Sequence, residues 1–400
     1  MLYLAPNRYR INSATIKKSC KTGLAGKNKI IGHMDSKDLL DNLPAETAAL
    51  LQENRFNQQK FRELRTSLQQ GQFETSRNQD TRNIEHLHPG DVVETQEVMA
   101  EEKSLRQKGL ECIRRGEVAL AILNGGMATR FGGGVKGIAE AHHGKSFLGL
   151  HLSRLINHET PPPVFLINSF ATYEKTKQHL EETQYWGLEK DQIALLRQNI
   201  SLRLTPGGDL FIGRDGNPSP YAPGHGDVFE TLARSSAFKD FKARGGKHVL
   251  ISNVDNLGAT LDPLWIGAHH HFDKAVTVEV ASRSAGDHGG APCRVDGRVE
   301  IVEGFRFPAG FSIHELPFFN TNTLTVRVDA IKPYPLSWYR ADKEVDGESA
   351  IQFERLMGEI TSFQESSYIE APRTGANSRF LPVKSQKDLE VLRLHLDSGG

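Results

Sequence analysis

The sequence predicts an α/β fold with a mixed, mainly parallel β-sheet and helices on both faces. From Val118 onward, short apolar runs of strand length alternate with amphipathic stretches of helical length. The first apolar run, residues 118–123, leads directly into a glycine-rich loop, and open α/β sheets bind phosphates where a strand ends in such a loop. A chain of 400 residues is long enough for one large domain and a smaller region.

Composition excludes several classes of protein. Lysine plus arginine and aspartate plus glutamate both number 49, and this zero net charge argues against a nucleic-acid binder. The cysteines Cys20, Cys112 and Cys293 form no C-x-x-C pair, so we expect a reducing, cytoplasmic compartment and neither a disulfide scaffold nor a structural zinc site. Because no apolar run approaches the roughly 20 residues of a membrane helix, we expect no membrane partner.

The first 34 residues contain seven basic residues and no acidic residue before Asp35. We interpret residues 1–34 as a basic leader without catalytic weight, or as sequence upstream of a true start at Met34; an organelle transit peptide is the alternative. The predicted division is residues 1–34, a helical N-terminal region over 35–116, and the catalytic domain over 117–400. The basic residues of the leader are Arg8, Arg10, Lys17, Lys18, Lys21, Lys27 and Lys29.

The elements follow in order from local patterns. Leucines at helical spacing predict helices over residues 35–73, and residues 74–90 are polar and predicted to be a loop or linker. A second helical stretch over 93–115 is expected to end at Gly116. The remaining predictions are strands over 118–123, 164–167, 247–252 and 276–281, and helices over 172–183 and 228–244.

The loop over residues 124–137 has six glycines, Arg130 and Lys136, and no acidic residue. Glycines allow backbone N–H groups to approach a ligand closely, so this loop predicts a nucleotide-phosphate site. Its G-x-G-x-x-G match is weak, since a dinucleotide fingerprint should follow the strand directly. The match of Gly144-Lys-Ser146 to a P-loop is also weak, because Ala139 stands where the first glycine belongs.

Two later segments also carry polar groups suited to phosphates. His225 lies between two glycines ahead of a predicted helix, which is a favourable place for an anion; the alternative is a simple turn with Asp227 as the helix cap. Asn253, Asp255 and Asn256 follow the strand over 247–252. A carboxylate at the end of a strand, close to phosphates, is typical of a Mg²⁺ ligand.

Three further patterns were weighed on the residues alone. Asn320 and Asn322 open a strand-like stretch and are suited to hydrogen-bond sugar hydroxyls, although an ordinary entry into a strand is the alternative. Lys384 follows a proline and precedes a helix-like stretch, as many surface lysines do. The adjacent histidines 269–271 point in different directions on a helix, so we interpret them as structural rather than metal-binding.

Together these segments resemble the UTP–sugar-1-phosphate uridylyltransferases, most closely the UTP–glucose-1-phosphate branch. The resemblance runs in order from about Gly109 to Leu392. The glycine loop is similar to the family pattern L-N-G-G-x-x-T-R-x-G…K-G, and the other matching segments follow at suitable spacing. They are Ile167-Asn-Ser-Phe170 with Thr172 and Thr176, Pro223-Gly-His-Gly-Asp227, Asn253-x-Asp-Asn-Leu-Gly-Ala259, Asn320-Thr-Asn322 and Pro382-Val-Lys384.

The resemblance implies a Rossmann-like nucleotidyltransferase fold of the glycosyltransferase-A kind, with UTP and a sugar-1-phosphate as partners and Mg²⁺ as cofactor. The sugar phosphate attacks the α-phosphorus in line, forming UDP-glucose and pyrophosphate, and this needs positioning and charge neutralisation rather than a nucleophilic side chain. The implied roles are catalysis by Lys136, Arg130, Lys384 and His225; nucleotide binding by Leu123, Asn124, Gly125, Gly126, Gln198, Gly224 and His225; sugar binding by Asn253, Gly290, Glu303 and Asn322; and metal binding by Asp255.

Departures from the family pattern bear on the sugar more than on the reaction. Ala128, Val135 and Thr323 replace a glycine, a proline and an asparagine of the pattern, and Ser282-Arg283 stands where a Lys-Thr pair is common. The segment from Gly109 to Gly116 is more like the N-acetylglucosamine-1-phosphate branch, so that sugar is the alternative. A non-catalytic UDP-sugar-binding protein is the alternative of another class. The chain ends soon after Lys384, without the C-terminal β-helix that the glucose branch uses to oligomerise, so we expect a monomer.

Overall fold

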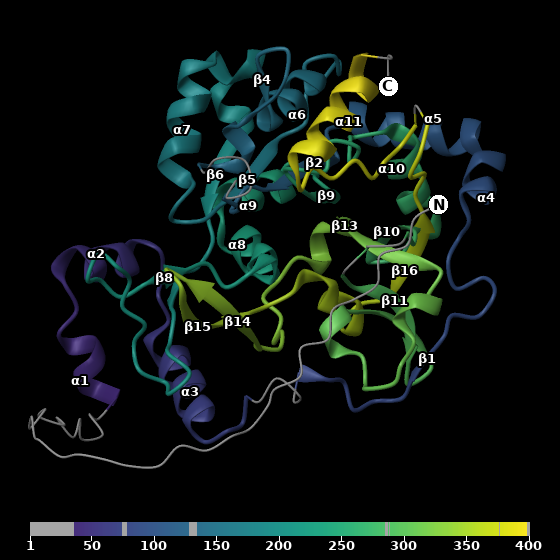
Figure 1. Cartoon of the computed structure of the whole chain (residues 1–400). Helices are drawn as coiled ribbons and strands as arrows, with labels where there is room; N and C mark the ends of the chain where they lie inside the picture. Colours follow the sequence, from purple (N-terminus) through teal and green to yellow (C-terminus); the bar gives the residue numbers. More distant parts are fainter. Residues whose placement is uncertain are drawn as a thin grey trace, which may run out of the picture. The chain divides into compact units, whose positions relative to one another are not determined.

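The computed structural model describes residues 36–73, 78–127, 134–284, 287, 289–375 and 377–397. The predicted leader and Arg130 lie outside the described residues. The chain divides into two compact units, Met1–Asn42 and Leu43–Gly400. The described part of the first unit contains the short helix α1 (Ser36–Asp41), and the second unit contains all the other elements (Figure 1).

The second unit is built on a seven-stranded sheet in the order β16-β10-β13-β9-β2-β5-β6. Parallel pairing joins β16 to β10 and joins β9, β2, β5 and β6 to one another, while β13 runs antiparallel to both of its neighbours. This confirms the predicted α/β class and the mainly parallel sheet. The strands are β2 (Val118–Leu123), β5 (Val164–Asn168), β6 (Ile193–Arg197), β9 (His248–Asn253), β10 (Val276–Ser282), β13 (Phe318–Arg327) and β16 (Ser366–Glu370).

Smaller sheets surround the main one. One has three strands in the order β1-β11-β12, and three others are two-stranded. These strands are β1 (Ile84–Glu85), β11 (Ala291–Val295) and β12 (Arg298–Val302); β3 (Glu140–His142) and β4 (Lys145–Ser146); β7 (Ser201–Leu202) and β8 (Pro220–Tyr221); β14 (Tyr339–Val345) and β15 (Glu348–Glu354).

Helices cover both faces of the main sheet (Figure 1). Along β2, Ala119 and Ala121 face a core shared with α8 and α9, whereas Leu120 and Ile122 face a second core shared with α6, α10 and α11. All residues of β2 before Leu123 are buried, as its unbroken apolar sequence requires. The helices of this unit are α2 (Ala45–Glu53), α3 (Gln58–Gln69), α4 (Thr95–Ala100), α5 (Glu102–Arg114), α6 (Phe147–Leu155), α7 (Tyr173–Glu182), α8 (Val228–Arg234), α9 (Ser236–Ala243), α10 (Pro263–Phe272) and α11 (Gln386–Asp397).

The N-terminal predictions are largely confirmed. Helices occupy the two predicted stretches, and Gly116 ends α5 with a φ of +67°. The prediction of a loop over residues 74–90 is wrong in part, because β1 pairs antiparallel with β11. Asp80 also forms ion pairs with Arg82 at 2.7 Å and with Arg306 at 2.6 Å. Within the described residues, no helix combines the length and the apolarity needed to cross a membrane.

Two glycines allow α5 and α10 to meet backbone to backbone. A Cβ atom added at Gly109 would come within 1.8 Å of the carbonyl oxygen of Pro263, and one added at Gly267 would come equally close to that of Leu105. Neither position can hold a larger side chain without moving a helix. The Gly109 segment, which favoured the N-acetylglucosamine branch in the sequence, therefore has a packing role.

We expect Gly109→Ala to lower the free energy of unfolding by about 1–3 kcal/mol, because the added methyl overpacks the helix contact. The sign is informative, since the same change in an unhindered helix would stabilise it by about 0.5–1 kcal/mol. Urea unfolding measures the effect. Ser104→Ala on the exposed side of α5 is the control and should change stability little; a stabilised Gly109→Ala protein would contradict the close contact.

Candidate functional site

A cavity of about 370 Å³ lies at the carboxyl ends of β2, β5 and β9, where open α/β sheets bind ligands. Nine of the predicted site residues line it together. Six residues beyond that set, among them Met127, Asp227 and Val254, complete the wall. The nine are Leu123, Gly125, Gly126, Lys136, Gln198, Gly224, His225, Asn253 and Asp255.

The glycine loop is fixed at both of its described ends. The Ser169 hydroxyl donates to the Gly125 carbonyl oxygen at 3.0 Å, and the Lys136 N–H donates to the Gly126 carbonyl oxygen at 3.2 Å. Met127 and Val135 form an antiparallel bridge between the two arms. Lys136 is thereby held beside the two glycines. Residues 128–133, with the predicted Arg130, lie outside the described part of the loop.

The side chain of Asn124 supports this loop from the interior of the protein. Its side chain is fully buried and donates to Asn168 Oδ1 at 2.8 Å and to Thr176 Oγ1 at 2.9 Å. A Cβ atom on Gly137 would lie 2.0 Å from Asn124 Oδ1, so the glycine there makes room for the amide. Asn124 is not among the residues that line the cavity. The predicted contact of Asn124 with a nucleotide therefore stays a prediction, and it concerns the Asn124 backbone alone. The Asn124 side chain is held by Asn168, which belongs to the later Asn-Ser-Phe segment.

Gln198 connects two loops at the cavity wall. A Cβ atom on Gly125 would lie 2.5 Å from Gln198 Oε1, and Gln198 Nε2 donates to the Gly224 carbonyl oxygen at 3.3 Å. The planar amide is therefore held against both glycines. An amide fixed in this way presents a donor and an acceptor in one plane, which suits the edge of a nucleobase.

His225 is held as a neutral hydrogen-bond donor. The Met357 N–H donates to His225 Nδ1 at 2.9 Å, so the ring hydrogen is on Nε2. Burial lowers the pKa of His225 to about 4, with Glu354 opposing the shift. Gly224 has a φ of +90°, and a Cβ atom there would lie 2.6 Å from the Arg355 carbonyl oxygen. The glycine before His225 is thus required by the close passage of the chain at Arg355.

Asp227 occupies the N-cap position of α8, as the alternative predicted, but its side chain makes no capping hydrogen bond. Its Oδ2 instead accepts from the Asn199 N–H at 3.1 Å while its Oδ1 pairs with Arg355. Burial raises the pKa of Asp227, and the nearby Arg355 opposes that shift. Sequence reasoning missed Arg355, because it belongs to no motif and its partner lies 128 residues earlier in the chain.

Lys136 and Asp255, predicted to serve different ligands, form an ion pair. Lys136 Nζ lies 2.5 Å from Asp255 Oδ2, and the two side chains are 16% and 18% exposed. The pair joins the glycine loop to the loop that follows β9. It places one cation and one carboxylate at the wall of the same cavity.

Three of the predicted sugar-binding residues lie together in a second group. The Asn320 N–H donates to the Gly290 carbonyl oxygen at 2.8 Å, and Asn320 Nδ2 donates to Asn322 Oδ1 at 2.9 Å. Glu303 Oε2 lies 3.2 Å from the position of a Cβ atom on Gly290. Asn322 has a φ of +58° at an irregularity in the pairing of β13 with β10. The pairing of β13 with β9 ends where Leu324 lies opposite Ile251, two residues before Asn253 of the cavity wall.

Glu303 has an unusual environment for a carboxylate. Burial raises its pKa to about 7, while Arg306 and the Gly290 N–H oppose the shift. Its Oε1 is buried without a hydrogen-bond partner among the described residues. That oxygen lies 3.5 Å from the position of a Cβ atom on Gly358, next to the Met357 N–H that binds His225. Glu303 thus lies beside the backbone segment that binds His225 of the cavity wall.

The segment that leads to Lys384 is bound to the loop after β9. Arg379 forms a buried ion pair with Glu279, with both guanidinium–carboxylate contacts at 2.7 Å. Beyond it, the Leu381 N–H donates to Asn256 Oδ1 at 2.9 Å and the Val383 N–H to the Asp255 carbonyl oxygen at 3.1 Å. Lys384 itself is exposed and does not line the cavity.

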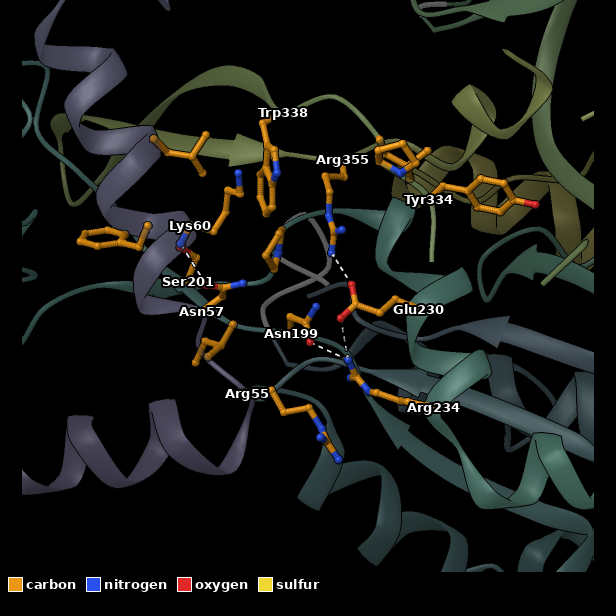
Figure 2. Close-up of a pocket in the computed structure, with 16 residues that line it drawn as sticks. Arg55, Asn57, Lys60, Asn199, Ser201, Glu230, Arg234, Tyr334, Trp338 and Arg355 are labelled. Carbon is orange, nitrogen blue, oxygen red and sulfur yellow. Dashed lines mark hydrogen bonds and ion pairs between the residues drawn. The ribbon is translucent and has the colours of Figure 1, made fainter. Parts of the chain in front are cut away.

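A second cavity of about 560 Å³ is lined by Arg355 and Glu230, among other residues (Figure 2). Its lining includes Pro223, which directly precedes the glycine-histidine loop, residues 224–226. Arg355 donates to Glu230 at 3.2 Å there, and Arg234 donates to Asn199 Oδ1 at 2.7 Å. This cavity is lined by residues from α3 and the turn before it, α8, residues 199–201 and the segment 334–338. Of its charged groups, Arg355 also pairs with Asp227 of the first cavity, whereas Lys60 pairs with Glu63 within α3.

Residues 58–397 match the family of UTP–glucose-1-phosphate uridylyltransferases. This chain belongs to that family. The UTP–glucose-1-phosphate uridylyltransferase of Hordeum vulgare is 31% identical over 295 residues, which are 68% of this chain and 61% of the relative. The chain therefore spans about three-fifths of the length of that curated relative.

Solved structures agree on the fold of this uridylyltransferase-family chain. A UDP-glucose pyrophosphorylase mutant of Leishmania major in complex with UDP-glucose has a TM-score of 0.65 at 25% identity, covering 88% of this chain and 80% of its own. The UDP-N-acetylglucosamine pyrophosphorylase of Trypanosoma brucei has a TM-score of 0.72 at 18% identity, covering 90% and 85%. The second likeness concerns the fold alone.

For this family member we expect Arg355→Met to lower the free energy of unfolding by about 3 kcal/mol, because it leaves the Asp227 carboxylate, 1% exposed, without its cation. Urea unfolding of a double-mutant cycle checks this. The double variant Arg355→Met/Asp227→Asn should recover part of the loss, since no charge is then buried. Strictly additive losses would contradict the pairing.

Glu303 predicts a pH dependence of stability. Its pKa rises from about 4.5 in the unfolded chain to about 7 in the native protein, so the native state holds the extra proton between these values. Stability contributed by Glu303 is therefore lost as pH rises from 4.5 to 7, by at most about 3 kcal/mol. Unfolding free energies at pH 5 and pH 8, compared with those of Glu303→Gln, isolate the effect. Equal slopes for the two proteins would show that Glu303 has an ordinary pKa.

Proposed function

We propose that this protein is a uridylyltransferase that forms UDP-glucose and pyrophosphate, reversibly, from UTP and glucose-1-phosphate. The observation that carries the proposal is the pairing of Lys136 with Asp255 in the cavity that also contains the glycine loop and Gln198. This cavity thus offers the planar amide of Gln198, several groups that can donate hydrogen bonds to phosphates, and the Asp255 carboxylate.

The nucleotide would bind along the cavity from Gln198 to Lys136. Gln198 and the Gly224 backbone suit the uracil edge, which needs both a donor and an acceptor. Gly125 and Gly126 present backbone to the phosphates, and His225 Nε2–H donates without adding charge. Lys136 supplies the positive charge. Arg130, in the adjoining part of the loop, remains a proposal from the family pattern.

Asp255 fits a Mg²⁺ ligand by its chemistry, because it is a partly buried carboxylate at the end of a strand with a phosphate-binding loop beside it. When bound there, the ion would neutralise charge on the phosphates. Lys136 shields the same carboxylate by its ion pair. Lys136 therefore compensates the partly buried negative charge of Asp255.

The sugar phosphate would lie between Asn253 and the group of Gly290, Glu303 and Asn322. The Glu303 carboxylate and the asparagine amides suit sugar hydroxyls, which both donate and accept hydrogen bonds. Lys384 would approach the sugar phosphate from the segment bound to the Asp255 loop. Since Gly109 has a packing role, we do not take its segment as a sign of the N-acetylglucosamine substrate.

In the reaction, an oxygen of the sugar-1-phosphate forms a bond to the α-phosphorus of UTP as the bond to the β-phosphate breaks. Pyrophosphate leaves, and no side chain forms a covalent intermediate. The residues act by holding the two phosphates in line and by neutralising charge. We further propose a Rossmann-like, glycosyltransferase-A-like domain that works as a cytoplasmic monomer; the two buried cysteines Cys112 and Cys293, both free thiols, support a reducing compartment.

The test is pyrophosphate release from UTP and Mg²⁺ with a panel of sugar-1-phosphates. We expect glucose-1-phosphate to give the highest kcat/KM. A higher value with N-acetylglucosamine-1-phosphate would reassign the sugar. If none of the sugar-1-phosphates gives pyrophosphate release but UDP-glucose binds measurably, a non-catalytic binding protein would be favoured.

Lys136→Ala is the control for this assay. We expect its turnover to fall by a factor of about 100–1000, as when one charge-stabilising donor is removed from an active site. Its circular dichroism spectrum should stay unchanged. Near-normal turnover of this variant would mean that the measured release comes from a contaminant or that Lys136 has no catalytic role.

A further inference from the structure

Against the expectation from the sequence, which assigned residues 269–271 a structural role and predicted no zinc site, we propose that this protein binds one Zn²⁺ ion through Cys112, His248 and His270. Their ligand atoms, one from each side chain, all lie within 4.8 Å of one another. The three come from the end of α5, the first position of β9 and the last turn of α10. His248 begins the strand that ends at Asn253, so this cluster is at the opposite end of β9 from the nucleotide cavity.

The spacing is close to that of a zinc site. With Zn–S and Zn–N bonds of about 2.3 and 2.0 Å, one sulfur and two nitrogens in tetrahedral positions lie about 3.3–3.5 Å apart. From separations of 4.8 Å or less, the ligand atoms have to approach one another by no more than about 1.5 Å. One thiolate and two imidazoles favour Zn²⁺ over Mg²⁺ or Ca²⁺, which bind oxygen.

His248 carries the strongest sign of a ligand. Its side chain is buried, and its Nε2 has no hydrogen-bond partner among the described residues. Its Nδ1 lies 3.1 Å from His269 Nε2, and His269 Nδ1 lies 2.7 Å from Thr277 Oγ1. Such a second layer of hydrogen bonds orients metal-binding histidines, and here it leaves Nε2 directed to an ion.

The backbone holds the other two ligands firmly. Cys112 and His270 each lie three residues after the glycine through which α5 and α10 touch, Gly109 and Gly267. The Glu117 N–H donates to the Cys112 carbonyl oxygen at 3.0 Å, and the Glu117 carbonyl oxygen accepts from the His248 N–H at 2.9 Å. The cysteine and the histidine are thereby tied through one residue. A preformed site of this kind needs little ordering on binding.

Binding replaces the thiol proton by the metal. The Cys112 thiol loses its proton to solvent as the Zn–S bond forms, and the fourth position takes a water molecule. His270 is exposed, which gives the ion a path from solvent. Burial and the Glu117 carboxylate, which accepts a hydrogen bond from the thiol, raise the pKa of Cys112 to about 11, so the ion has to displace that proton. Glu117 also pairs with Lys247 at 2.6 Å.

A second set of metal-type residues among those described is His142, His143 and Asp397. Both imidazoles already contact the same carboxylate oxygen, at 2.8 and 3.2 Å. The set contains no thiolate, and His143 is 79% exposed. We therefore assign the ion to the cysteine cluster and use Asp397 as a control.

The experiment titrates the full-length, chelator-treated protein with Co²⁺ as a spectroscopic probe, then displaces it with Zn²⁺. We expect one equivalent bound, with a thiolate-to-cobalt charge-transfer band that Zn²⁺ removes. Cys112→Ser should abolish the band, and His270→Gln should weaken Zn²⁺ affinity by at least about tenfold, a change expected when a metal site loses a supporting group. Since His270 is exposed, that variant should fold normally.

Matched controls separate this site from the rest of the chain. Cys20→Ser, Cys293→Ser, His271→Gln and Asp397→Asn should keep both the band and the affinity. A band that survives Cys112→Ser, or the lack of any band, would overturn the proposal. So would an affinity lost in Asp397→Asn and unchanged in His270→Gln. These readouts do not depend on the uridylyltransferase assay, so the two proposals can fail separately.

Discussion

The ion pair between Lys136 and Asp255 is the interaction on which the site depends. It joins the loop after β2 to the loop after β9, two adjacent parallel strands. Because both side chains are mostly buried, neither charge could be kept there without a partner of opposite sign. The cavity walls are therefore set at a fixed separation before any ligand arrives. The proposed phosphate ligand would find the lysine already in position.

A second charge pair supports the opposite wall. Asp227 and Arg355 bind the glycine-histidine loop to the segment after β15, and the Met357 backbone there sets the hydrogen on His225. The loop has glycines on both sides of the histidine because the Arg355 backbone passes too close for a side chain. The ion pair and the packing thus favour the same conformation of this loop. His225, the neutral donor, is therefore held rigidly.

The sequence predicted the parts of the fold and site that local pattern determines. Apolar runs located the strands, and Gly116 located the end of α5. The motifs identified nine residues that line one cavity. What it missed depends on partners distant in the chain. Arg355 is in no motif, β1 is too short for a periodic signal, and Cys112 becomes a neighbour of His248 only when α5 meets β9. Asn124 shows the converse: it belongs to a motif, but its side chain supports the glycine loop from the interior of the protein.

The reversed direction of β13 has a consequence for how the site is assembled. The parallel strands around the cavity are followed by polar residues at the point where the chain leaves the sheet. β13 runs antiparallel to β9, so at this same edge the chain is entering the sheet. Asn320 and Asn322 accordingly precede the apolar part of their strand instead of following it. One inverted strand thus lets both incoming and outgoing chain segments place polar residues at the same end of the sheet.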